Sequence, residues 1–331
     1  MDGGLFIISL DFELHWGVFD RPGMEYNQNL MGARKAVPLM LKQFEQFDIH
    51  ATWACVGLLF AKSKAEIEKW SPEERGQPDY KNKKYSAYKV HIGNDENSDP
   101  LHFAANLIEK VRSVKGQEIA THTFSHYYCL EEGQTIEQFE ADIKAAMEAA
   151  KANNVRLYSI VFPRNQVNGA YLSVLKKHGI KCYRGTASGF YYNSNRTKKY
   201  NRIGNKALRL LDSYFNIAGH HAYDLYSTGE SEELINIKGS RFLRPYTPAL
   251  SFMEPLKLRR IKKSMEYAAK NNEVYHLWWH PHNFGTNTEK NILMLKNILE
   301  FYTNLKKKYG MRSCNMKESN QFCRKNIENI A

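Results

Sequence analysis

The chain has 331 residues, of which 43% are hydrophobic and 25% charged, a composition that is ordinary for a globular protein and excludes the disordered and fibrous classes. Its longest near-apolar stretch, residues 51–61, is shorter than the roughly 20 residues that a membrane-spanning helix needs. The 47 basic and 35 acidic residues give a formal net charge of +12, which suits a phosphate-bearing substrate, nucleic acid or a membrane surface, although a solvated basic surface is the simpler explanation.

The first predicted element is a buried strand at residues 5–11. The apolar run that begins there is not preceded by a basic segment, and it is too short and too β-branched for a signal peptide. We therefore expect a cytoplasmic protein. The five cysteines are odd in number and have no Cys-x-x-Cys spacing, so free thiols are expected rather than disulfides or a cysteine-based zinc site.

After this strand, short apolar runs alternate with amphipathic segments, which is typical of βα units around a mainly parallel sheet or barrel. Further strands are predicted at residues 50–55, 118–121, 157–162, 181–184, 234–237, 274–279 and, more weakly, 311–316. Helices with apolar residues three to four positions apart are predicted at residues 33–47, 102–114, 135–153, 169–178, 255–271 and 288–309. We therefore predict a single α/β domain over residues 1–331, folded as a distorted (β/α) barrel of seven to eight parallel strands.

Two stretches interrupt this alternation. Residues 71–100 are polar, and residues 187–233 carry many Gly, Asn and Tyr residues without a clear period. Long excursions of this kind in a compact domain are usually functional loops or disorder. We expect both as loop insertions at the mouth of the barrel.

Polar side chains follow four of the predicted strands. In a parallel barrel the active site lies at the C-terminal strand ends, because the βα loops converge there. Two of these residues are histidines spaced i,i+4, so one helical turn would point both imidazoles the same way, and a carboxylate from another segment would complete a three-ligand metal site. The residues concerned are Asp11 and Glu13 after the first strand, His122 and His126 after the third, Arg164 after the fourth, and His280 and His282 after the seventh.

In these motifs the chain resembles the polysaccharide deacetylases, the NodB-homology carbohydrate esterases of family 4. Residues 9–13 (Ser-Leu-Asp-Phe-Glu) resemble the family's opening Thr-Phe-Asp-Asp-Gly motif in its Asp-x-Glu form. Residues 51–57 resemble its second strand, and residues 116–126 its metal motif, Gly-His-Glu-Ile-x-x-His-(Ser/Thr)-x-x-His. Residues 162–165 and 277–281 resemble its later Arg-Pro and Leu-x-His motifs more loosely.

Two departures from the family pattern concern the site itself. Glu13 stands where the family usually has a metal-binding Asp, and it is one methylene longer. The Asp-x-x-x-Trp motif that normally shapes the acetyl pocket has no clear counterpart. The metal geometry and the wall of the acyl pocket are therefore the least determined parts of the resemblance.

The resemblance implies a TIM-like NodB barrel and a divalent metal cofactor, with Zn²⁺ as the first choice. A carboxylate beside a metal-bound water can take its proton, and an imidazole can protonate a leaving amine near neutral pH. The implied roles are Asp11 as general base, Glu13, His122 and His126 as metal ligands, Arg164 as the partner that keeps Asp11 ionised, and His280 as general acid.

Simpler interpretations stay open for some of these residues. Asp11 could cap a helix or close a turn, and Arg164 could bridge to a loop carboxylate at the surface. His282 could be the acid in place of His280.

Four residues are candidates for substrate binding, namely His15, Trp16, Arg244 and His282. His15 and Trp16, just after the acidic pair, could line the site or only pack. Arg244, with Arg241 nearby, would suit a phosphate or an acidic sugar, but a structural ion pair is an equal alternative.

The function that the resemblance implies is hydrolysis of the N-acetyl group of an acetylated amino sugar. With a cytoplasmic location, the substrate would be a nucleotide- or lipid-linked precursor of a surface polysaccharide such as lipopolysaccharide O-antigen or capsule. A metal-dependent hydrolase of a non-sugar or cyclic amide is the alternative on the same fold. A non-catalytic carbohydrate- or nucleic-acid-binding relative is the alternative of a different class, although we expect no nucleic-acid partner. The sequence does not set the oligomeric state.

Overall fold

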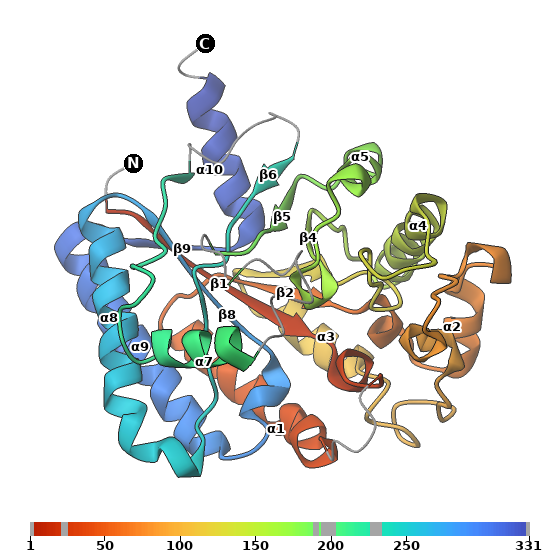
Figure 1. Cartoon of the computed structure of the whole chain (residues 1–331), viewed down its shortest axis with the longest axis horizontal. Helices are drawn as coiled ribbons and strands as arrows, with labels where there is room; N and C mark the ends of the chain where they lie inside the picture. The colour runs from red at the N-terminus through yellow and green to blue at the C-terminus, as the bar shows by residue number, and fades with distance from the viewer. Residues whose placement is uncertain (1–2, 21–25, 188–191, 193–202, 226–233, 329–331) are drawn as a thin grey trace.

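The computed structural model describes residues 3–20, 26–187, 192, 203–225 and 234–328. Its strands form one sheet in the order β6-β5-β4-β3-β2-β1-β8-β7 (Figure 1). Strand β9 pairs with the first half of β1. Every pairing between these strands is parallel. The strands are β1 (Leu5–Phe12), β2 (Ala51–Cys55), β3 (Gln117–Thr121), β4 (Ser159–Val161), β5 (Cys182–Arg184), β6 (Ile235–Asn236), β7 (Arg241–Phe242), β8 (Val274–Trp279) and β9 (Arg312–Cys314).

The two edges of the sheet are joined by the segment from β6 to β7. In its first half the N–H of Ile237 donates to Tyr183 O of β5, and in its second half the N–H of Ser240 donates to His276 O of β8, both at 2.8 Å. The sheet therefore curls so far that one continuous segment, residues 235–243, hydrogen-bonds to β5 on one side and to β8 on the other. This confirms the predicted distorted barrel. The strand predicted at residues 234–237 covers only the first half of this segment, and β7 was not predicted.

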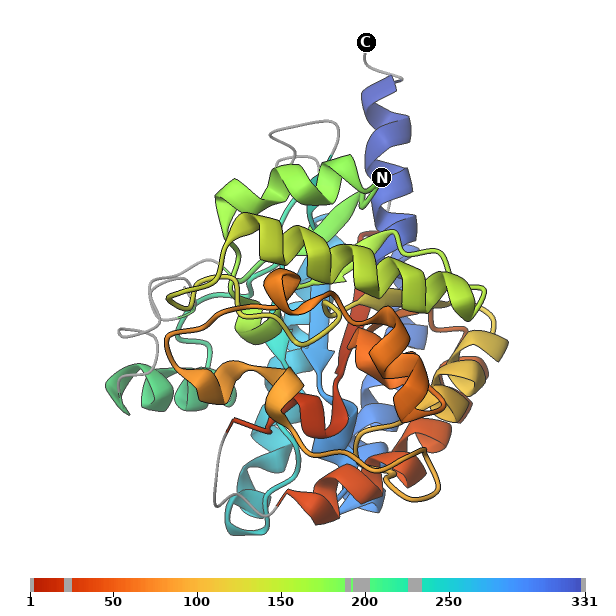
Figure 2. The same ribbon diagram turned by 90° about the vertical axis from the view of Figure 1, so that its right-hand side faces the viewer.

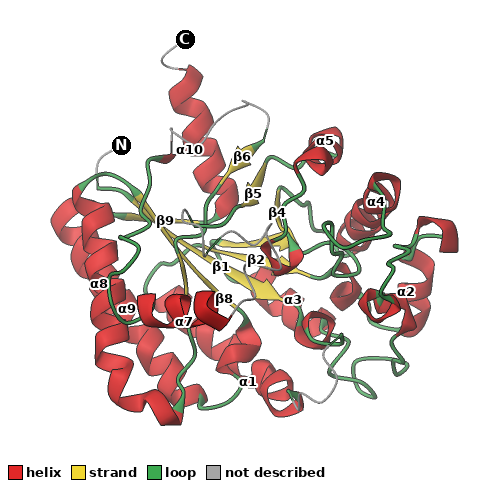
Figure 3. Cartoon of the chain, viewed as in Figure 1, coloured by secondary structure: helices red, strands yellow, loops and turns green. Residues whose placement is uncertain are grey.

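Helices surround the strands on the outside (Figure 3). Every predicted helix is present, and α9 has the predicted bounds, whereas α2, α7 and α10 were not predicted. In the described part of the chain, no helix combines the length and the apolar character that crossing a membrane requires. The helices are α1 (Asn27–Gln46), α2 (Lys64–Trp70), α3 (Ala105–Ser113), α4 (Ile136–Ala152), α5 (Leu172–Lys177), α7 (Ile203–Asp212), α8 (Glu254–Lys270), α9 (Thr288–Tyr309) and α10 (Met316–Glu328).

The two predicted insertions differ in structure. Residues 71–100 form turns and the short 3₁₀ helices η3 (Glu74–Gly76), η4 (Lys83–Tyr85) and η5 (Ala87–Lys89), as expected of a loop. Residues 187–233 contain helix α7, so the expectation of an irregular loop is wrong there. Figure 2 shows this helix at the edge of the molecule. The rest of this insertion lies partly outside the described residues.

The strands place alternate residues inside and outside the barrel. All eight residues of β1 are buried, as expected of a central parallel strand covered on both faces. Phe6, Ile8, Leu10 and Phe12 pack in the core shared with the helices, whereas Leu5 and Ile7 belong to a second cluster, to which all the strands except β7 contribute and which α10 closes at one end.

Because side chains alternate along a strand, the inward face continues into polar residues at the C-terminal ends. On β1 that face continues from Leu5 and Ile7 into Ser9 and Asp11. On β8 the inward residue Val274 is followed on the same face by His276 and Trp278, and on β5 Cys182 is followed by Arg184. The mouth of the barrel is therefore lined by polar groups.

Candidate metal centre

The carboxylate of Glu13 enters the centre from the end of β1. Glu13 is buried and immediately precedes the 3₁₀ helix η1 (Leu14–Gly17). A Cβ atom at Gly17 would lie 2.0 Å from Glu13 Cδ, so glycine at this position makes room for the carboxylate. The motif after β1 thus includes Gly17, which the sequence analysis did not single out.

The two histidines lie on a loop after β3 and not on the helical turn that their spacing suggested. Thr123 and His126 have left-handed backbone conformations, with φ of 64° and 57°, which are uncommon for non-glycine residues and are often found at functional sites. Both rings still reach the same point, with their centroids 5.1 Å apart. The expected convergence is therefore present, but its local geometry was wrongly predicted.

Asp142 of α4 holds this loop in place. Its buried carboxylate accepts hydrogen bonds from the backbone N–H groups of Phe124 (2.6 Å) and Ser125 (3.0 Å), and also from the Ser125 hydroxyl. Burial raises the pKa of Asp142 to about 6, against the opposing effect of these hydrogen bonds. Sequence reasoning missed this residue, because an acidic residue on a helix gives no signal of where it points.

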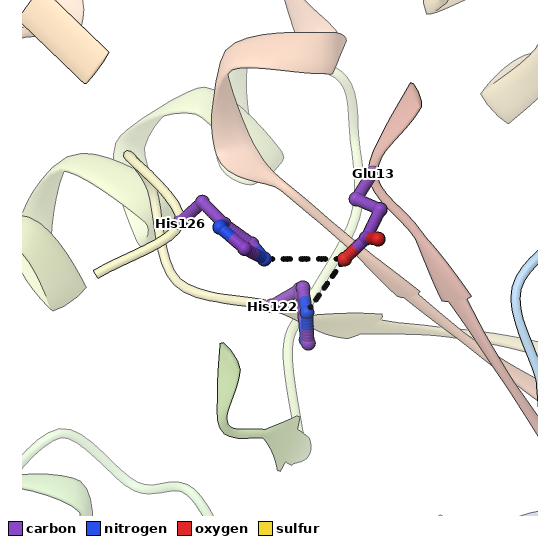
Figure 4. A group of neighbouring side chains, drawn as sticks. All are labelled: Glu13, His122 and His126. Atoms are coloured by element: carbon purple, nitrogen blue, oxygen red, sulfur yellow. Dashed lines mark hydrogen bonds and ion pairs between the residues drawn. The ribbon is translucent and has the colours of Figure 1, made fainter. Parts of the chain in front are cut away.

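Three donor atoms converge at the mouth of the barrel (Figure 4). Glu13 Oε2 lies 3.1 Å from His126 Nε2 and 3.3 Å from His122 Nε2, and the ligand atoms of the three residues all lie within 4.8 Å of one another. His122 Nδ1 donates to Val161 O at 2.8 Å, which leaves Nε2 as the acceptor nitrogen that faces the centre. A hydrogen bond on the far nitrogen is the usual way in which a metal-binding histidine is oriented.

The charge state of these groups also suits a divalent cation. Burial would raise the pKa of Glu13, but the charges and hydrogen bonds of His280, His122 and His126 lower it well below its usual value. Burial lowers the pKa of His126 against the opposing effect of Glu13. An ionised carboxylate and neutral imidazoles are the forms that bind metal, and two nitrogens with one carboxylate form a donor set that Zn²⁺ accepts. These three residues therefore fit a metal site.

Asp11 lies beside this cluster and is paired with Arg184. The Arg184 guanidinium donates to both Asp11 oxygens, at 2.6 and 2.7 Å, and also to Ser9 Oγ at 2.9 Å and Asn165 Oδ1 at 2.8 Å. Burial would raise the pKa of Asp11, but the charge and hydrogen bonds of Arg184 lower it below its usual value. Asp11 is therefore held as a carboxylate.

Arg164 does not pair with Asp11, so this part of the prediction is wrong. Its backbone is left-handed, with φ of 55°, and its guanidinium lies 3.9 Å from the centre of the Tyr128 ring and pairs with Asp20 and Glu131. The physical reason is strand parity, since Arg184 extends the inward face of β5 whereas Arg164 follows the end of β4 on a separate turn. A strand-borne Arg at residue 184 was visible in the sequence but had no motif around it.

We expect a double-mutant cycle to distinguish the two arginines. Arg184→Met alone should lower the free energy of unfolding by about 3–5 kcal/mol, because it leaves the buried Asp11 charge without a partner. The double variant Asp11→Leu/Arg184→Met should recover much of that loss. Urea denaturation of the single and double variants measures the coupling energy.

The matched cycle pairs Asp11→Leu with Arg164→Met, and its coupling energy should stay within about 0.5 kcal/mol. Because the pKa of Asp11 is lowered in the folded state, the Asp11–Arg184 contribution should be present above the usual carboxyl pKa and lost as the pH falls through the lowered value. A large coupling to Arg164, or none to Arg184, contradicts the pairing described here.

His280 is the histidine that faces the two carboxylates. Its Nε2 lies 3.5 Å from Glu13 Oε1 and 3.7 Å from Asp11 Oδ2, while its Nδ1 lies 3.2 Å from Asn283 Oδ1. His282 stacks against His280, with 5.1 Å between ring centroids. His276 is buried deeper in the barrel and bonds to Ser9 Oγ at 2.7 Å, and burial followed by the charge of Arg184 lowers its pKa to about 3.

The other candidate residues lie around the centre in different environments. Trp16 is buried and donates to His102 O at 2.9 Å. His15 is half-buried and bonds to His102 Nε2 at 2.8 Å, and burial followed by the charge of His102 lowers its pKa to about 4. Arg244 donates to Ser213 Oγ at 2.8 Å and lines a cavity next to His280. All five cysteines are buried free thiols, as expected.

Comparison with known proteins gives matches in structure only. No protein-family model matches the chain, and no curated protein matches its sequence. A protein described as a polysaccharide deacetylase from Mycobacterium smegmatis superposes with a TM-score of 0.61 at 13% identity, over 98% of this chain and 91% of its own. A second, from Pseudomonas aeruginosa PAO1, superposes with a TM-score of 0.54 at 9% identity, over 96% and 89%.

An allantoinase superposes as well as the Pseudomonas aeruginosa protein, with a TM-score of 0.54 at 10% identity, over 97% of this chain and 90% of its own. At such identities the similarity shows the fold and does not by itself show the function. The chain has the parallel (β/α) barrel fold of these deacetylases, as the motifs predicted.

Proposed function

We propose that this chain is a metal-dependent hydrolase of the polysaccharide deacetylase family, which removes the acetyl group from an N-acetylated amino sugar. The single observation that carries the proposal is the convergence of Glu13, His122 and His126 next to the Asp11–Arg184 pair. A metal-ligand set adjacent to an oriented carboxylate is an arrangement that supports metal-dependent hydrolysis of an amide.

The reaction divides among the residues as follows. A divalent metal held by Glu13, His122 and His126, with Zn²⁺ as our first choice, would polarise the amide carbonyl and acidify a water. Asp11 takes the proton of the attacking water, and Arg184 keeps Asp11 ionised and aimed. His280 gives a proton to the departing nitrogen, because an amine leaves readily only when protonated. Acetate and a free amino sugar are the products.

His280 is a better candidate for the acid than His282. Its Nε2 lies 3.7 Å from Asp11 Oδ2 and 3.5 Å from Glu13 Oε1, whereas His282 stacks on the His280 ring. We propose Arg184 in the supporting role that the sequence suggested for Arg164. His15, Trp16, Arg244 and His282 stay candidates for contact with the sugar or its carrier.

For the substrate we propose an acetylated sugar that is a precursor of a surface polysaccharide such as O-antigen or capsule, linked to a nucleotide or a lipid. The net charge of +12 supports an anionic carrier. The cytoplasmic location and the single-domain organisation over residues 1–331 stay predictions. The similarity to an allantoinase favours hydrolysis of a cyclic amide as the second candidate.

Acetate release from metal-loaded protein tests this proposal. Zinc-loaded protein incubated with N-acetylglucosamine derivatives should release acetate, chelation should abolish the release, and added Zn²⁺ should restore it. An acetate-coupled assay measures all three states, with allantoin as the parallel substrate. Turnover of allantoin alone would instead support the cyclic-amide hydrolase, and failure to retain stoichiometric metal would support a binding protein without catalysis.

A further inference from the structure

A cavity of about 600 Å³ opens next to His280. This volume is within the range of pockets that hold small-molecule ligands. Its walls come from the residues after β5, from the segment around β7, from Trp278 of β8 and from one face of α7. The cavity therefore lies between the barrel mouth and the unpredicted helix.

The inner end of the cavity reaches the proposed catalytic groups. His280 lines it, and the Nε2 atom of His280 lies 3.7 Å from Asp11 Oδ2. Asn165 also lines it and accepts a hydrogen bond from Arg184 at 2.8 Å. A sugar positioned for reaction at Asp11 would thus extend its remaining part into this cavity.

The described walls of the cavity are cationic. Lys206 and Arg209 of α7 and Arg241 and Arg244 near β7 line it, and none of the described lining residues is acidic. Arg241 pairs with Asp212 behind the wall, at 3.2 Å, and Arg244 donates one of its hydrogen bonds to the hydroxyl of Ser213, at 2.8 Å. Four cationic side chains and no acidic one among the described lining residues favour an anionic ligand, and Arg and Lys are the usual partners of phosphate.

The same walls also offer apolar surface. Ile203, Ala207 and Leu210 recur on one face of α7 at helical spacing and line the cavity, opposite Phe242 and Trp278. Apolar walls with a few cations fit a ligand in which a phosphate is attached to a flat base or a hydrocarbon. A neutral sugar polymer would use the aromatic rings and hydroxyl contacts but would have no use for the cationic side chains.

We propose that this cavity binds the phosphate-bearing carrier of the N-acetylated sugar, so that the substrate is a glycosyl phosphate or diphosphate whose carrier lies against α7. This inference rests on the proposed deacetylase function, and it assigns Lys206 and Arg209 as specificity residues. A nucleoside and a lipid carrier supply the same phosphate chemistry and differ only in what lies against the apolar face.

Binding and selectivity together test this assignment. In the zinc-loaded protein, the double variant Lys206→Ala/Arg209→Ala should bind uridine diphosphate and inorganic diphosphate at least about tenfold more weakly, because hydrogen bonds between charged partners are stronger than those between neutral groups. Calorimetry measures both affinities. The same variant should lower kcat/KM for a sugar diphosphate by a similar factor and leave kcat/KM for neutral diacetylchitobiose unchanged. The matched control is Lys35→Ala/Lys263→Ala, which removes two exposed charges from the middle of α1 and α8.

Equal effects of the two double variants, or equal losses on the charged and neutral substrates, would overturn the assignment. Diphosphate binding that depends on Lys206 and Arg209 without acetate release from any sugar would sustain the cavity assignment and refute the deacetylase. Acetate release from neutral sugars with no diphosphate binding would sustain the deacetylase function and refute the cavity assignment. Comparison of uridine diphosphate with farnesyl diphosphate then identifies the carrier, because the tighter ligand is the one that fits the apolar face.

Discussion

Replacement of His122 or His126 by alanine is expected to abolish metal binding and hydrolysis together. Each histidine supplies one of three donor atoms that lie within 4.8 Å of one another, so two donors are too few to hold the ion. Metal polarisation of a carbonyl is worth several kcal/mol, and each 1.4 kcal/mol is about tenfold in rate. We therefore expect kcat/KM to fall by about 10³-fold or more, measured by acetate release alongside metal content by mass spectrometry.

A thermal readout separates this loss from a general folding defect. Metal that binds only the folded protein raises its stability, so chelation should lower the Tm of the wild type and leave that of His126→Ala unchanged. The matched control is His178→Ala, which removes a histidine bonded to Glu140 at 2.9 Å on the outer helices and should retain metal and activity. Stoichiometric metal in His126→Ala would contradict the ligand assignment.

Asp11→Asn is expected to retain metal but lose turnover. The amide is nearly the same size as the carboxylate and can still accept a hydrogen bond from Arg184, so the centre should stay assembled. It cannot take a proton, and loss of general base catalysis typically costs about 10²–10⁴-fold in rate. Metal content and acetate release, measured on the same preparation, check both halves of this expectation.

Glu13→Gln is the matched comparison, since it makes the same chemical change on the neighbouring carboxylate. It should weaken metal binding, because an amide oxygen is a poorer donor than a carboxylate for a divalent cation. If Glu13→Gln keeps the metal and Asp11→Asn loses it, the roles of the two carboxylates are exchanged. The lowered pKa of Asp11 also predicts that its protonation reduces the wild-type rate only at pH values below its usual pKa, near 4.

The structure explains why Arg184, and not Arg164, is the partner of Asp11. Arg184 lies 173 residues from Asp11 in the chain, and its guanidinium rests on the Trp278 ring at 4.3 Å. Three strands that are far apart in sequence therefore build one buried ion pair. Arg164 has the more conspicuous motif, but its turn directs it to Tyr128 and Asp20 outside this cluster.

Local patterns in the sequence were sufficient for most of the elements. The apolar run of β1 and the helical spacing of α9 predicted their type and, for α9, its bounds, because periodicity depends only on near neighbours. The motifs around Asp11, Glu13, His122 and His126 also predicted which residues meet, since they lie at or shortly after the C-terminal ends of strands and parallel strands bring such ends together. Helix α7 escaped prediction because its ten residues, in which Ile203, Ala207 and Leu210 recur at helical spacing, lie within a longer segment rich in Gly, Asn and Tyr.

Three features depended on contacts between distant segments, and only the tertiary structure decided them. Strand order and parity placed Arg184, rather than Arg164, against Asp11. The carboxylate of Asp142 fixed the histidine loop in a left-handed conformation instead of a helical turn. The hydrogen bonds of residues 235–243 to both β5 and β8 closed the barrel. The sequence by itself thus determined which polar residues meet at the mouth of the barrel, whereas their partners followed from packing, because a side chain's partner depends on what the fold brings next to it.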